Sequence, residues 1–124
     1  MKLLLTIILC SISIFGLAQP RITFDNKTHK FPKTKEGILL EHDYHFTNTG
    51  NQPLMIEGIK VSCTCTKYTF PKNPLLPGEK GIIHVTFDTN KKYSWQDRIL
   101  VITSNAKNNP ATIRFKVMVV NEKH

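Results

Sequence analysis

Residues 38–47 read ILLEHDYHFT, and this stretch decides the class of fold. On an extended chain, one face takes Leu40, His42, Tyr44 and Phe46, and the other takes Glu41, Asp43, His45 and Thr47. Successive side chains of a β-strand point to opposite faces. The alternation therefore predicts a β-strand that buries one of its faces.

Further segments with a similar pattern surround this strand and are separated by turn residues. We expect further strands at 21–24, 54–62, 66–70, 80–88, 97–104 and 111–120, with an edge piece at 29–32. In the segment 54–62, the alternation places Leu54 and Ile56 on one face and Ile59 on the other. No apolar pattern of helical period longer than a turn or two follows residue 18. About seven strands at this spacing predict an all-β sandwich or barrel.

The N-terminus has the pattern of a secretory signal peptide. A single lysine precedes an apolar run at 3–17, and small residues lead up to a cut after Ala18. We therefore expect a signal peptide at 1–18 and one mature domain at 19–124. An uncleaved anchor is the alternative, but the run is shorter than the about 20 apolar residues that a spanning helix needs. The mature domain is expected to be periplasmic or secreted, without a membrane span.

Cysteine usage limits how the domain is held together. Cys10 lies in the signal stretch directly after Leu9, which is too large for a lipoprotein cut, so we interpret Cys10 as a small apolar residue. The mature domain then contains only Cys63 and Cys65. These two residues are too close in sequence to join distant strands as the disulfide of an antibody domain does. The core must be held by apolar packing.

The chain is basic, with 17 Lys and Arg against 9 Asp and Glu. The basic residues are scattered along the chain, and no motif of a nucleic-acid-binding fold is present. Nucleic acid is therefore not expected as a partner. A solvated basic surface and an anionic partner in the cell envelope are the two interpretations that remain.

Six short segments occur in an order that resembles a known family. They are 46–51 (FTNTGN), 53–56 (PLMI), 62–66 (SCTCT), 77–81 (PGEKG), 85–89 (VTFDT) and 104–106 (SNA). The chain is similar to the bacterial domain-of-unknown-function 1573 family, which is common in exported proteins of the Bacteroidetes type. The resemblance implies an immunoglobulin-like β-sandwich, related to Hydin-type domains and to the major sperm protein, and a location in the envelope. It implies no activity.

The cysteine motif departs from that family at one position. The family has Gly between the two cysteines, whereas this chain has Thr64. Glycine permits a positive φ in a tight turn, and a β-branched residue resists it. The geometry of a cysteine pair that depends on such a turn is therefore in question here.

Cys63 and Cys65 allow three interpretations. A local disulfide is favoured by an oxidising compartment, but i and i+2 residues of a regular strand lie about 6.5–7 Å apart, so the bond needs a turn or a bulge. A soft metal, Cu or Zn, is the second interpretation, with Cys63 and Cys65 as the metal ligands. Two structural thiols are the third.

A metal site would need further ligands, because two are too few for a closed zinc site. The histidines are His29, His42, His45, His84 and His124. His42 and His45 lie on opposite faces of their predicted strand, so they cannot join one site. His42 and His84 are the better candidates, and either is equally well a residue of the surface or the core edge.

The sequence contains no catalytic signature that we recognise. It has no Gly-x-Ser-x-Gly elbow and no His-Glu-x-x-His helix, so no catalytic residue is assigned and no enzyme is expected. We expect a non-catalytic envelope module that binds a protein partner, and an exposed strand edge is one way to bind it. A metal-binding or redox-active periplasmic protein that uses Cys63 and Cys65 is the alternative. The single tryptophan, Trp95, is expected to cover a core edge beside Tyr93, or else to be an exposed binding residue.

Overall fold

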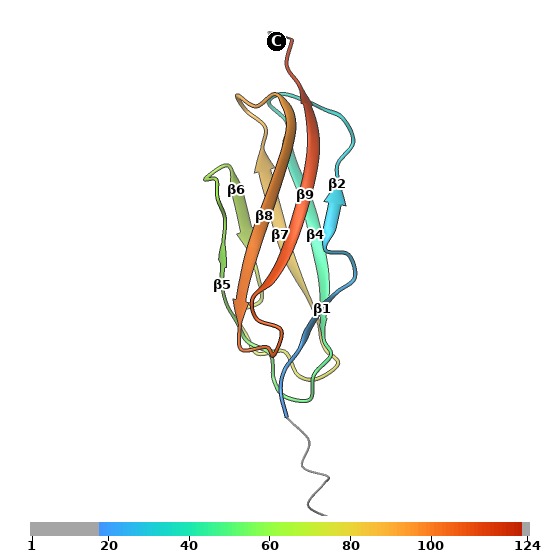
Figure 1. The fold of residues 1–124 in the computed structure, drawn as a ribbon, viewed down its shortest axis with the longest axis vertical. Helices are drawn as coiled ribbons and strands as arrows, with labels where there is room; N and C mark the ends of the chain where they lie inside the picture. The colour runs from blue at the N-terminus through green and yellow to red at the C-terminus, as the bar shows by residue number, and fades with distance from the viewer. Residues whose placement is uncertain (1–17, 123–124) are drawn as a thin grey trace, which may run out of the picture.

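The computed structural model describes residues 18–122, so the expected signal peptide lies almost entirely outside the described residues. Nine strands make up the described fold (Figure 1). They are β1 (Ile22–Phe24), β2 (Thr28–Lys30), β3 (Thr34–Lys35), β4 (Leu39–Asn48), β5 (Ile56–Lys60), β6 (Thr66–Thr69), β7 (Lys80–Asp88), β8 (Ser94–Ser104) and β9 (Ala111–Val120). Residues 18–122 include no helix that is long and apolar enough to cross a membrane.

The strands form two sheets that pack face to face as a sandwich. One sheet has the order β1-β4-β7-β6 and is antiparallel throughout. The other has the order β2-β9-β8-β5, and β3 also pairs with β9. The short strands β2 and β3 run parallel to β9, whereas β8 is antiparallel to β9 and to β5. The expected all-β, immunoglobulin-like class is confirmed.

Alternating apolar residues of the long strands fill the space between the sheets. The inward residues of β9 are Ala111, Ile113, Phe115, Val117 and Val119, and all five are buried. From the opposite sheet, Phe87 meets Phe115 with ring centroids 5.0 Å apart. The Tyr44 hydroxyl also crosses between the sheets and donates a 2.8 Å hydrogen bond to the Arg114 carbonyl oxygen. Packing and this bond join the two layers.

Two expectations about side chains were wrong. Ile59 is buried together with Ile56, because a bulge between Ile56 and Gly58 shifts the alternation by one residue. Trp95 does not cover a core edge: it is 55% exposed on β8, and Tyr93 beside it is 52% exposed. The strand β3 was not expected at all.

Candidate functional site

The strand β8 is paired along one side only for much of its length. The register with β9 runs from Ser94 to Ile102, whereas β5 pairs with β8 only from Val101 to Ser104. In the described part of the chain, no strand therefore pairs with the β5 side of β8 between Ser94 and Leu100. An edge of this kind presents unpaired backbone groups to a further strand.

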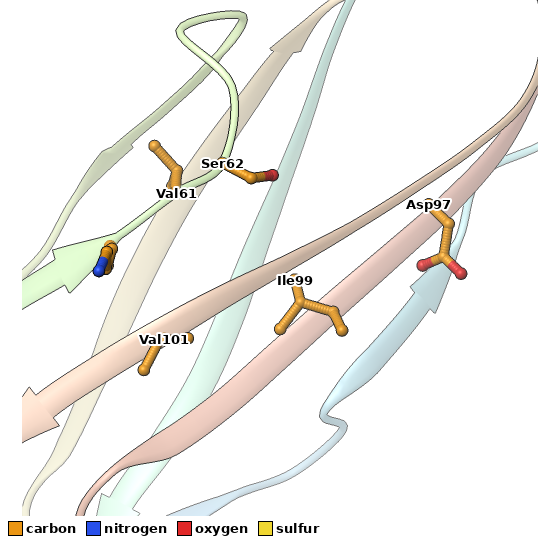
Figure 2. A pocket seen from close by; sticks show the side chains of 6 residues that line it. Val61, Ser62, Asp97, Ile99 and Val101 are labelled. Atoms are coloured by element: carbon orange, nitrogen blue, oxygen red, sulfur yellow. The ribbon is translucent and has the colours of Figure 1, made fainter.

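The free edge exists because the chain leaves this sheet after Lys60. Val61 and Ser62 lead away from β8 into a turn and then into β6 of the other sheet. The departing segment and β8 enclose an open groove of about 590 Å³ (Figure 2). Its lining residues are Lys60, Val61, Ser62, Asp97, Ile99 and Val101. The groove thus lies where β8 loses its partner.

The outward face of β8 beside the groove is largely apolar. Ile99 is 49% exposed, and Trp95 and Val101 share its face of the strand. The Lys30 ammonium lies 5.3 Å from the centroid of the Trp95 ring, in the geometry of a cation–π contact. Exposed apolar side chains next to a free strand edge are a feature of interaction surfaces.

The charged groups around the groove leave it with a positive balance. Arg114 donates hydrogen bonds to both carboxylate oxygens of Asp97. These bonds lower the pKa of Asp97 and raise the pKa of Arg114. The only carboxylate of the lining is therefore compensated by its neighbour, and Lys60 is the other charged lining residue. The site suits an acidic or neutral segment better than a basic one.

Arg98 points inward from the same edge. Its guanidinium carbon lies 5.4 Å from the centroid of the Phe87 ring, and its Nη2 donates to Gln96 Oε1 at 2.7 Å. An inward-pointing charge on an edge strand is one of the ways in which proteins limit indiscriminate pairing. The outer face of this edge is therefore open to a partner, whereas the charge of Arg98 on its inner face disfavours indiscriminate pairing.

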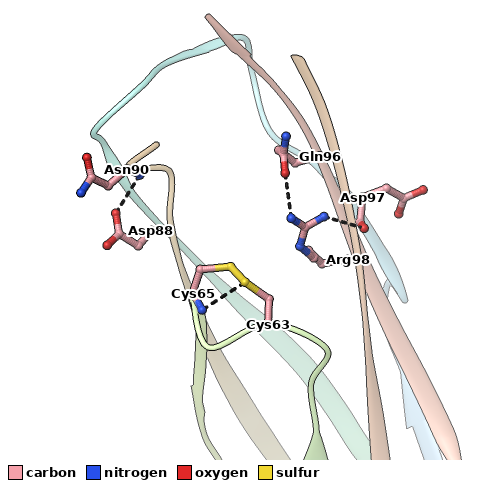
Figure 3. Close-up of a disulfide and its surroundings, with 7 residues drawn as sticks. All are labelled: Cys63, Cys65, Asp88, Asn90, Gln96, Asp97 and Arg98. Carbon is pink, nitrogen blue, oxygen red and sulfur yellow. Dashed lines mark hydrogen bonds between the residues drawn. A yellow bond between two sulfur atoms is a disulfide. The ribbon is translucent and has the colours of Figure 1, made fainter. Parts of the chain in front are cut away.

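The two cysteines lie in the turn that follows the groove. Cys63 and Cys65 form a disulfide with Cα atoms 5.2 Å apart (Figure 3). The Thr66 N–H closes the turn on the Cys63 carbonyl oxygen at 3.1 Å. Thr64 is not among the residues with positive φ, so this turn does not need the glycine of the family motif. Of the three interpretations, the structure shows the local disulfide.

The histidines do not gather around the cysteines. Across residues 18–122, no group of three or more His, Cys, Asp and Glu side chains could hold a metal ion. Because the disulfide leaves no thiolate, a metal at Cys63 and Cys65 would require the reduced pair and stays a prediction. His124 lies outside the described residues.

The two favoured histidines occupy opposite faces of their sheet. His42 points toward the sandwich interior and stacks on His29 with ring centroids 3.6 Å apart. His84 points outward, and its Nδ1 lies 2.5 Å from Asp43 Oδ1. The hydrogen bond to Asp43 is the main cause that raises the pKa of His84, whereas burial lowers the pKa of His29 and is the main cause that lowers the pKa of His42.

The sequence suggested an exposed strand edge but did not indicate which strand provides it. A signal was present in Ile99-Leu100-Val101-Ile102, where apolar residues occupy both faces of one strand. A sandwich strand with a solvated outer face normally alternates apolar with polar residues. The sequence thus shows apolar residues on both faces of this part of β8, although Val117-Met118-Val119-Val120 of β9 has the same pattern, so the free edge could not be assigned from it.

Comparisons with known proteins agree on the fold. A family model described as a protein of unknown function (DUF1573) matches residues 22–119. No curated protein matches the chain. A protein of unknown function from Porphyromonas gingivalis W83 is 12% identical with a TM-score of 0.72, and the match covers 86% of this chain and 50% of that one.

Two further solved structures share the architecture. An ASH/PapD-like domain of human CEP192 is 9% identical with a TM-score of 0.68, covering 87% of this chain and 91% of that one. The CsuC–CsuE chaperone–tip adhesion subunit pre-assembly complex of Acinetobacter baumannii contains a chain that is 16% identical with a TM-score of 0.56, covering 82% of this chain and 52% of that one. At these identities, the likeness shows the fold alone.

Proposed function

The chain belongs to the DUF1573 family, and from this premise we propose that it is an exported, non-catalytic module of the cell envelope that binds a protein partner by strand addition to β8. The partner contributes an extended segment that runs along Ser94–Leu100. Its backbone pairs with the free edge, and its side chains enter the groove beside Ile99.

The observation that carries this proposal is the coincidence of a free edge with an apolar groove. β8 lacks a second strand partner between Ser94 and Leu100 in the described fold. The groove of about 590 Å³ lies against the same residues and contains Ile99 and Val101. In strand addition, backbone hydrogen bonds supply affinity and side-chain pockets supply specificity. The edge and the groove supply these two components.

Charge defines the kind of segment that fits. Arg114 compensates Asp97, whereas Lys60 lines the groove at the end of β5. The net charge of the whole chain is +8. A partner segment that alternates apolar residues with Asp or Glu complements this surface, because opposite charges across an interface favour the correct encounter.

The proposed export and the proposed non-catalytic role are supported by the sequence. The apolar run at 3–17 and the small residues before Gln19 support export. The missing catalytic motifs support a binding role. The likeness to a chain of a chaperone–subunit complex shows that this architecture occurs in a protein assembly of another organism.

Site-specific photocrosslinking in the native envelope tests the proposal. A photoreactive phenylalanine analogue replaces Ile99 in one variant and Ile82 in a matched control. Ile82 is 44% exposed on the outer face of the opposite sheet, which makes it comparable with Ile99 at 49%. We expect a discrete crosslinked product from position 99, absent at position 82 and weakened when Lys60→Glu is added. Equal products from both positions, or none at 99, would contradict the proposal.

The crosslinked segment then provides a defined probe. A synthetic peptide with its sequence should slow amide exchange in Ser94–Leu100 when added to the purified chain, since strand addition gives these amides hydrogen-bond partners. Binding of the peptide without new protection in β8 would show another binding mode.

A further inference from the structure

The Cys63–Cys65 disulfide encloses a single residue, Thr64, and lies in the turn between the two sheets. The stabilisation from a disulfide rises with the length of the loop that it closes. This bond closes the shortest loop compatible with an intervening residue, and it connects no distant strands. The disulfide therefore contributes little to the stability of the fold, and a role other than stabilisation is considered for it.

Cys65 is half-buried, packing in part against the hydrophobic core, and lies beside an opening to solvent. It lines an open groove of about 410 Å³ together with Leu39, Thr64, Lys67, Thr86 and Asp88. The backbone of the turn is held in place, because the Asp88 N–H donates to the Cys65 carbonyl oxygen at 2.9 Å. A disulfide held beside an open groove can be reached by an incoming thiolate.

Cys63 has a hydrogen-bond donor on its sulfur. The Cys65 N–H donates to Cys63 Sγ at 3.2 Å, as the dashed line in Figure 3 marks. When the S–S bond breaks, the negative charge develops on the sulfur that leaves. A donor already directed at Cys63 Sγ stabilises that charge, so the two sulfurs are not equivalent.

From this geometry we propose that Cys63–Cys65 is a redox-active disulfide that exchanges with a dithiol, with attack directed at Cys65 and Cys63 as the leaving thiolate. A thiolate of the dithiol attacks Cys65 Sγ, the Cys63–Cys65 bond breaks, and a mixed disulfide forms on Cys65. Cys63 takes a proton from water. The second thiolate of the dithiol then attacks the dithiol's other sulfur in the mixed disulfide. Cys65 leaves as a thiolate and takes a proton from water. The dithiol loses two electrons and two protons and becomes a disulfide, and the cysteine pair gains both.

The charged residues of the groove tune this reaction. Lys67 places a positive charge in the lining, which attracts the incoming thiolate. Asp88 places a negative charge there, and its Oδ1 accepts a 2.9 Å hydrogen bond from the Asn90 N–H. Lys67 and Asp88 are positioning residues, and the sulfurs alone react. The inference does not rest on strand addition at β8, and either proposal can fail without the other.

The first experiment measures reduction of the folded protein by dithiothreitol, using the full chain with Cys10→Ser so that Cys63 and Cys65 are its only cysteines. If the disulfide reacts in the folded state, the rate rises linearly with thiolate concentration. A rate that reaches a plateau at the rate of unfolding would overturn the proposal, because the bond would then open only in the unfolded chain.

The second experiment maps the direction of attack. The oxidised protein is treated with glutathione, quenched in acid, alkylated, and analysed by peptide mass spectrometry. We expect glutathione on Cys65 and the alkyl group on Cys63. Glutathione found mainly on Cys63 would overturn the assigned direction of attack.

Charge variants distinguish the effect of charges in the groove on the reduction rate from the effect of the net charge of the protein. Lys67→Gln should slow reduction by about two- to fivefold, and Asp88→Asn should accelerate it by a similar factor, as expected for one charge near the attacking anion. Lys107→Gln is the matched control, since Lys107 lies in the β8–β9 loop at the opposite end of the sandwich. Equal rates for Lys67→Gln and Lys107→Gln would exclude a role for Lys67.

Discussion

Phe46 and Gly81 show how a single residue identity sets the packing of the fold. The two residues are register partners on β4 and β7, and Phe46 is fully buried. The Phe46 ring lies over Gly81, at a place where any Cβ atom would come within 2.6 Å of the Phe46 Cζ atom. The absence of a side chain at 81 therefore makes room for the ring, and a glycine near the start of β7 is explained by close packing.

Gly81→Ala should destabilise the fold by about 1–3 kcal/mol, because overpacking a buried site forces side chains or backbone to shift. Urea unfolding at equilibrium measures the change. Gly58→Ala is the control, since an added Cβ at Gly58 meets nothing within 4 Å. An equal loss of stability in both variants would show that backbone effects, and not the contact with Phe46, dominate.

The histidines predict how stability responds to pH. Burial lowers the pKa of His29 and of His42, and the stacked His29 further lowers that of His42. As the pH falls through the unfolded-state value of about 6.5, the unfolded chain takes up protons first, so these residues reduce stability below that pH. In His29→Phe, the loss of stability between pH 7.5 and pH 5 should be smaller than in wild type, as urea midpoints would show.

His84 should change the stability of the fold with pH in the opposite direction. Its hydrogen bond with Asp43 raises its pKa, so its stabilising effect is present below about pH 6.5 and disappears as the pH rises through the folded-state value. His84→Gln should therefore lose stability at pH 5 and little at pH 9. A loss of the same size at both values would indicate a role in packing instead of titration.

At the scale of elements, the turn between β5 and β6 carries both candidate sites. Lys60 ends the pairing of β5 with β8, and the next residues form the wall of the β8 groove. The turn at Cys63 and Cys65 follows, and the chain then enters β6 of the other sheet. Because the crossover occurs after only five residues of β5, β8 keeps a free edge.

The double variant Cys63→Ala, Cys65→Ala should remain folded and lose at most about 1.6 kcal/mol, the loop-closure value for a ring of about three residues. Thermal unfolding with and without the disulfide gives the measurement. A loss of several kcal/mol would assign the bond a structural role and would weaken the case for redox exchange.

At the scale of the whole molecule, the sandwich is joined across its layers by aromatic packing. Phe115 of β9 contacts Phe87 from the opposite sheet and Phe31 from the N-terminal segment, at centroid distances of 5.0 and 5.8 Å. β9 is also flanked by strands on both sides, by β8 on one and by β2 and β3 on the other. It is the most enclosed strand of its sheet, in contrast to β8.

Native-state hydrogen exchange should reflect this difference. Amides on the free side of Ser94–Leu100 should exchange faster than those of Ala111–Val120, because they lack a neighbouring strand as acceptor. Mass spectrometry or NMR resolves the two segments. Equal protection in both, for the purified chain at low concentration, would mean that another element covers the edge.

Alternation along the chain was enough to predict the class of the fold and most of the strands. The expected bounds 80–88 and 111–120 are those of β7 and β9, because a period of two in apolar residues directly reports a buried sheet face. Covalent geometry also limits a pair two residues apart, so Cys63 and Cys65 could be expected to bond only at a turn or a bulge.

Which strands lack partners and which side chains meet became known only from the packed fold. Ile59 turned inward at a bulge, and Trp95 remained outside, for reasons that depend on pairing with other strands. His42 and His84, both favoured as ligands, were separated to opposite faces of one sheet by their register. The free edge of β8 and the groove beside it arise from the path of β5. Pairing between segments distant in sequence arises only when the sheets assemble. The local alternation of apolar residues therefore does not predict which strands pair.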